Sequence, residues 1–143
     1  MRIYVDTSFL VSLYAIDSNS SSAIALMASS PGQHIISTFG ELEALNALQL
    51  RVFRKEITSQ QANASWRDLQ SDVRNGVLAV RALPDQVFER AYALSLKTAA
   101  RLGTRSADLL HVAAALEMEA DCLYSFDRQQ RKLAQAVRLK TNQ

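Results

Sequence analysis

Four acidic side chains stand at positions where carboxylates could do chemistry. Asp6 directly follows the apolar run 3–5, and Asp127 directly follows the run 122–126. Asp108 lies in the first turn of a strongly apolar helical segment, and Glu43 lies within a second such segment, 42–48. A buried carboxylate is costly unless a positive charge or hydrogen-bond donors compensate it. Each of these acids therefore needs a partner.

Two interpretations of these acids stay open at this level. Asp is a favoured N-cap residue, so Asp6 and Asp127 could each cap the helix that follows. Asp108 could complement the dipole of its helix, which contributes under about 1 kcal/mol at an exposed end. Alternatively, one hard divalent cation site would satisfy all four acids, because Mg²⁺ and Mn²⁺ prefer carboxylate and water oxygens.

The segments that must position these acids alternate between strand and helix patterns. Short apolar runs predict strands at 3–5, 34–37, 77–80 and 121–126. Helical spacing predicts helices after Thr7, in or after the Ser-rich stretch 18–22, and over 38–55, 58–74, 84–102, 106–121 and 128–136. This alternation predicts an α/β fold, an open parallel sheet of four to five strands with helices on both faces. In such sheets the site lies beyond the carboxyl ends of strands, where Asp6 and Asp127 stand.

Composition excludes several classes of protein. With 143 residues, 48% of them hydrophobic and only four Gly, the chain fits one folded domain over residues 1–143. The single cysteine, Cys122, excludes an internal disulfide and a clustered zinc or iron–sulfur ligand set, so a reducing cytoplasm is expected. Asp6 interrupts the first apolar run after three residues, so neither a signal peptide nor a membrane span is expected.

Three segments resemble the PIN-domain ribonucleases, and within them the VapC-type toxins of bacterial and archaeal toxin–antitoxin pairs. These segments are YVDTSFLVSLY at 4–14, ISTFGELEALNALQLRVFRKEIT at 36–58 and RSADLLHVAAALEMEADCLYSFDRQQRKLA at 105–134. They fall in the family's order, and the resemblance covers almost the whole chain. It implies a PIN-like sheet and one PIN domain.

By this resemblance, the metal-binding and catalytic residues are Asp6, Glu43, Asp108 and Asp127. Glu41 competes with Glu43, but Glu43 has the family's spacing, six residues after Ser37 and three before Asn46. The implied reaction is hydrolysis of RNA phosphodiester bonds with Mg²⁺ or Mn²⁺. The implied partners are RNA, a cognate antitoxin protein and a second copy of the chain in a homodimer. The alternative is a catalytically silent or RNA-processing PIN module that binds RNA or a protein.

Several other positions lie near these acids and could support them. Thr7 and Ser125 correspond to the family's hydroxyl residues beside the first and last acids, although Thr is commoner than Ser at the latter position. Asn46 lies one helical turn after Glu43 and could orient that acid or a water molecule, or its amide could simply pack against a neighbouring helix. His111 follows Asp108 by three residues, and we expect a buried histidine bonded to a neighbour rather than a metal ligand.

Basic residues provide candidate RNA contacts. The net charge of +2 alone does not indicate a nucleic-acid partner, but from Arg128 to the end the chain has five basic residues and no acid. Within this stretch, Arg128 and Arg131 follow a proposed metal ligand. Arg51 and Arg54 share a helical face and could contact phosphates, although a solvated face is the favoured explanation for them. Arg105, near Asp108, could pair with a carboxylate or bind phosphate.

Overall fold

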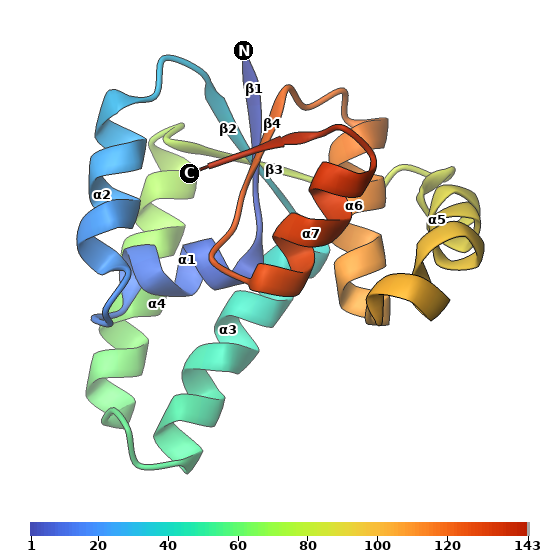
Figure 1. Cartoon of the computed structure of the whole chain (residues 1–143). Coiled ribbons are helices and arrows are strands. Elements are labelled where there is room, and N and C mark those ends of the chain that lie inside the picture. Colours follow the sequence, from blue (N-terminus) through green and yellow to red (C-terminus); the bar gives the residue numbers. More distant parts are fainter. Residues whose placement is uncertain (143) are drawn as a thin grey trace.

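The strands form one parallel sheet in the order β3-β2-β1-β4-β5 (Figure 1). In the computed structural model, which describes residues 1–142, all four strand pairings are parallel. The prediction of a parallel α/β sheet of four to five strands is therefore confirmed. The strands are β1 (Arg2–Val5), β2 (Gln33–Ser37), β3 (Leu78–Arg81), β4 (Cys122–Tyr124) and β5 (Lys140–Thr141).

Helices connect the strands, and several begin at side chains that cap them. Thr58 and Gln61 form a capping box at the start of α4, and Ser37 accepts a hydrogen bond from the Gly40 amide at the start of α3. The helices are α1 (Thr7–Tyr14), α2 (Ser20–Ser29), α3 (Thr38–Phe53), α4 (Ser59–Arg74), α5 (Val87–Leu102), α6 (Ser106–Glu117) and α7 (Arg128–Ala136). No helix within the described residues is both long and apolar enough to cross a membrane.

Some predicted boundaries were wrong. The helix expected over 106–121 ends at Glu117, because Glu119 has a left-handed φ of 55° that breaks the helix. The strand expected over 121–126 is shorter and spans only Cys122–Tyr124, which is β4. The helix expected from Pro84 begins at Val87, after a turn in which the Val87 amide donates to the Pro84 carbonyl. The C-terminal strand β5 lies in a segment with no predicted strand.

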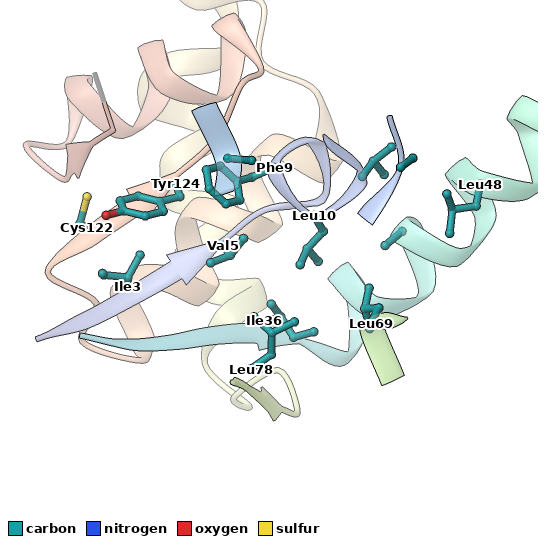
Figure 2. Close-up of a cluster of buried hydrophobic side chains, with 14 of the residues drawn as sticks. Ile3, Val5, Phe9, Leu10, Ile36, Leu48, Leu69, Leu78, Cys122 and Tyr124 are labelled. Carbon is teal, nitrogen blue, oxygen red and sulfur yellow. The ribbon is translucent and has the colours of Figure 1, made fainter. Parts of the chain in front are cut away.

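The two faces of the sheet pack against different helices. Ile3, Val5 and Ile36 point to the face covered by α1, α2, α3 and α4, part of which Figure 2 shows. Tyr4 and Ile35 point to the opposite face, which α5, α6 and α7 cover. Successive residues of a strand point to opposite faces, so the buried runs needed apolar residues at every position.

The strand order reverses at β1. From β1 the chain proceeds through β2 to β3 on one side, and then crosses to β4 on the other side. The Asp6 amide donates to the Tyr124 carbonyl at 3.1 Å, which holds the carboxyl ends of β1 and β4 together. The residues after these two strands therefore lie at the position where open α/β sheets place their sites.

Candidate functional site

The four predicted acids meet in space. Asp6, Glu43, Asp108 and Asp127 line one cavity of about 580 Å³, called the acidic cavity below. Each comes from a different element: the end of β1, the second turn of α3, the first turn of α6 and the start of α7. Sequence spacing left this open, and the topology determines it, because these elements converge at the switch point.

Asp6 and Asp127 each cap a helix, as the capping interpretation of the sequence predicted. Asp6 Oδ1 accepts from the Phe9 amide at 3.0 Å and from the Ser8 hydroxyl at 2.7 Å. Asp127 Oδ1 accepts from the Gln130 amide at 3.0 Å. In both residues the cap uses Oδ1, so capping and cation binding are compatible roles for one carboxylate.

Glu43 and Asp108 also have internal partners. Glu43 Oε1 accepts from the Thr7 hydroxyl at 2.6 Å and lies 2.5 Å from His111 Nε2. Asp108 Oδ2 accepts from the Arg105 amide at 3.0 Å, which caps α6. The expectation that His111 is a buried histidine bonded to neighbours is confirmed, since its side chain also contacts the Tyr4 hydroxyl.

Arg105 supplies a positive charge in direct contact with two of these acids. Its guanidinium lies between Asp108 and Asp127, with Nη2 at 3.3 Å from Asp108 Oδ1 and 2.8 Å from Asp127 Oδ2. Its Nε also donates to Asp108 Oδ2 at 3.2 Å. The side chain is 64% exposed, so it reaches the acids from the solvent side of the cavity. Both carboxylates thus face a cation rather than each other.

The electrostatic state of the acids follows from burial and donors. Burial raises the pKa of Asp6 above its ordinary value, and the positive field of His111 and nearby donors offset only part of that effect. Burial also works to raise the pKa of Glu43, but hydrogen bonds from His111 and Thr7 outweigh it and leave a lowered pKa. For Asp127, the Gln130 amide and Arg105 likewise outweigh burial. Of these three acids, Asp6 is the one whose burial is compensated least.

The donor set fits a hard divalent cation. The hydrogen bonds that Asp6 and Glu43 accept within the described residues fall on one oxygen of each carboxylate. In the described part of the chain, the hydrogen bonds to Asp127 Oδ2 and Asp108 Oδ1 come from Arg105 alone. Across residues 1–142, however, no three His, Cys, Asp or Glu side chains are already arranged to hold a metal ion. The fit therefore lies in the chemistry of the carboxylates, and the cavity would have to contract around an ion.

The predicted supporting residues have mixed outcomes. Thr7 contacts Glu43 rather than the acid next to it in sequence. Ser125 is fully buried and accepts from the Asp127 amide at 2.9 Å, so it stabilises the turn into α7. The Asn46 side chain is exposed and makes no hydrogen bond to Glu43, so it does not orient that acid directly, and a role in orienting a water molecule stays a prediction.

Ser8 has a role that the sequence did not reveal. Its hydroxyl donates to Asp6 and accepts from the Phe126 amide at 2.9 Å and the Asp127 amide at 3.2 Å. It therefore joins the ends of β1 and β4 directly at the cavity. A hydroxyl two residues after the first acid was the only available signal.

The basic candidates separate into two groups. Arg51 and Arg54 line the acidic cavity, and Arg51 Nη2 lies 3.2 Å from Asp17 Oδ2. Arg128 and Arg131 do not line it, although they follow Asp127 on α7. Only the first pair is therefore placed to contact a ligand within the cavity.

Both the sequence and the fold of this chain are similar to those of known proteins. The family model described as "PIN domain" matches residues 3–136. No curated protein matches the sequence. Among solved structures, VapC20 of Mycobacterium tuberculosis, a Sarcin-Ricin loop cleaving toxin, is similar with a TM-score of 0.71 and 23% identity over 91% of this chain and 93% of that one. VapBC-1 of nontypeable Haemophilus influenzae matches with a TM-score of 0.68 and 14% identity, over 99% and 97% of the two chains. FitAcB of Neisseria gonorrhoeae matches with a TM-score of 0.69 and 14% identity, over 99% and 96%.

Proposed function

This chain belongs to the PIN-domain family, and we propose that it is a metal-dependent endoribonuclease acting as the toxin of a toxin–antitoxin pair. One observation carries the proposal: four carboxylates from four elements line one cavity at the switch point of the sheet. Two of them hold a side-chain cation between them, so the site already tolerates positive charge where a metal ion would lie.

The residues proposed to hold Mg²⁺ or Mn²⁺ are Asp6, Glu43, Asp108 and Asp127. When bound, a divalent cation supplies hydroxide near neutral pH and neutralises charge on the phosphate under attack. The chain's own part is positioning. The caps and donors fix one oxygen of each acid. The other oxygens of Asp6 and Glu43 are available to the cavity, and those of Asp108 and Asp127 become available when Arg105 leaves.

RNA phosphates need positive charge near the acids, and Arg51 and Arg54 provide it. Both line the acidic cavity, and Asp17 restrains Arg51 so that little side-chain entropy is lost on binding. Arg105 would have to leave Asp108 and Asp127 for an ion to enter. In that state its guanidinium, already at the cavity mouth, can pair with a phosphate. Arg128 and Arg131 would contact RNA only outside the cavity.

The toxin role, a cognate antitoxin, a homodimer and a cytoplasmic location are proposals of the same kind. The first three are supported by similar structures described as a toxin and as a toxin–antitoxin complex. An apolar stripe on α5 also supports a protein partner, since Phe88, Tyr92 and Leu96 are 49%, 65% and 90% exposed. Light scattering on Leu96→Glu beside the wild type tests the homodimer, which this charge should dissociate if the stripe is its interface.

The test of the proposed activity is cleavage of a mixed cellular RNA pool by the purified chain. Reactions with Mg²⁺, Mn²⁺ or EDTA are compared for the wild type, for Asp6→Asn and for Asp68→Asn, whose carboxylate is exposed on α4 away from the cavity. Cutting that needs metal, survives in Asp68→Asn and vanishes in Asp6→Asn supports the nuclease. A folded wild type that cuts nothing supports the silent binding module instead.

A further inference from the structure

A buried chain of hydrogen bonds lies behind Glu43. His111 Nε2 lies 2.5 Å from Glu43 Oε1, and His111 Nδ1 lies 2.8 Å from the Tyr4 hydroxyl. The Tyr4 hydroxyl in turn donates to Ser37 Oγ at 3.0 Å. Tyr4 and Ser37 are fully buried, and His111 is 3% exposed. This series of hydrogen bonds therefore extends from the core beside the sheet to the edge of the acidic cavity.

The imidazole ring has no freedom to turn. The Tyr4 ring meets it edge-on with centroids 5.8 Å apart, and the Phe39 ring lies 5.3 Å from it. The start of α3 is also close, since a Cβ added at Gly40 would lie 3.5 Å from His111 Cε1. With both nitrogens bonded and the ring packed between aromatic neighbours, His111 is a rigid support.

Glu43 depends on that support. Its side chain is 29% exposed, and a glutamate with this freedom samples several rotamers unless it is held. Its two hydrogen bonds within the described residues, from Thr7 and His111, both fall on Oε1. Oε1 is therefore fixed against the protein, and Oε2 is the oxygen that stays available to the acidic cavity.

We propose that His111 is a positioning residue that holds Glu43 with one carboxylate oxygen directed to the acidic cavity, anchored in turn by Tyr4 and Ser37. The inference rests on the proposed function only in that Glu43 is taken to bind the cation. Hydrogen-bond partners behind a metal-binding carboxylate typically contribute about 10- to 100-fold in metal affinity or activity. A histidine that merely fills the core would contribute to stability alone.

Two substitutions separate these roles. The amide nitrogen of Gln can take the place of imidazole Nε2, so His111→Gln keeps the hydrogen bond to Glu43 and loses the one to Tyr4. Asn reaches only to the position of Nδ1, so His111→Asn keeps the Tyr4 contact and loses the support of Glu43. Both variants replace one buried ring with one buried amide, which makes them matched controls for each other.

The experiment measures Mn²⁺ affinity by calorimetry, thermal unfolding in EDTA, and kcat and KM for RNA cleavage. His111→Asn should bind Mn²⁺ about tenfold or more weakly and lose kcat by a similar factor, with KM for RNA nearly unchanged. His111→Gln should stay within about threefold of the wild type in both. Equal Mn²⁺ affinity and kcat in His111→Asn and the wild type would overturn the proposal. The proposal would also be overturned if both variants lost Mn²⁺ affinity and kcat to the same extent and in proportion to the fall in their unfolding temperatures.

If a His111 variant does not fold, a third variant tests whether the anchored His111 positions Glu43. Tyr4→Phe removes only the anchoring hydroxyl, and it should weaken Mn²⁺ binding several-fold while Mn²⁺-free RNA affinity stays constant. Unchanged Mn²⁺ binding would refute the anchor. A wild type that binds Mn²⁺ but cuts no RNA defeats the proposed nuclease and leaves the affinity comparison valid, whereas a wild type that binds no Mn²⁺ defeats both.

Discussion

Asp6→Asn should raise stability without metal and remove the stability that metal provides. Asp6 is 3% exposed, and burial raises the pKa of its carboxyl in the folded state. A folded-state pKa above the unfolded value means that the ionised form costs stability at neutral pH. Asn is as good an N-cap as Asp, so the hydrogen bond from the Phe9 amide can persist.

In EDTA at pH 7 the variant should therefore be more stable than the wild type, by about 0.5–2 kcal/mol, the range of a typical stabilising single substitution. The gain should shrink as the pH falls through the raised folded-state pKa and should vanish below the ordinary Asp pKa, since both states of the wild type are then protonated. Mn²⁺ at 100 times its dissociation constant should stabilise the wild type by about 2.7 kcal/mol and the variant by much less.

Urea unfolding followed by circular dichroism, with EDTA or Mn²⁺, measures both effects. Asp68→Asn is the matched control, because its exposed carboxylate should change stability by under about 0.5 kcal/mol and leave the Mn²⁺ effect intact. An Asp6→Asn variant that is clearly less stable than the wild type in EDTA, or that gains as much from Mn²⁺, would refute this account of the cavity.

Three further predictions concern other parts of the molecule. Arg105→Ala should tighten Mn²⁺ binding, because its guanidinium no longer competes for Asp108 and Asp127; calorimetry showing weaker binding would contradict this. Cys122 should react slowly with a thiol reagent in the folded protein and rapidly in urea, since burial raises its pKa and blocks access. Thr58→Ala should cost about 1 kcal/mol of unfolding free energy by breaking the capping box and leave RNA cleavage unchanged, and equal urea midpoints would count against it.

The fold and the family could be predicted because they depend on signals local to the chain. The fully apolar runs around Ile3 and Ile35 belong to strands buried on both faces, and the helical spacing between them requires crossover helices. Ends of elements were less predictable. The break after Glu117 depends on one left-handed residue, Glu119, whose conformation no local pattern required. β5 has only two residues and forms through its pairing with β4.

The acids themselves could be selected from the sequence, because a carboxylate in an apolar segment needs compensation wherever it lies. Their partners could not. Asn46 shares a helix with Glu43 but lies on its exposed side, whereas His111, 68 residues away, supplies the hydrogen bond. Ser8 gained its role only when β4 came beside β1.

The sequence by itself therefore determined the parallel α/β sheet, the family and the identity of the four acids. Residue types and the periodicity of apolar residues can be read directly from the sequence. Only the tertiary structure decided that the acids share one cavity, that Arg105 bridges two of them and that His111 holds a third. Apart from the contact between Arg105 and Asp108, these contacts join residues distant in sequence. They form because the strand order reverses at β1 and brings the ends of four separate elements together.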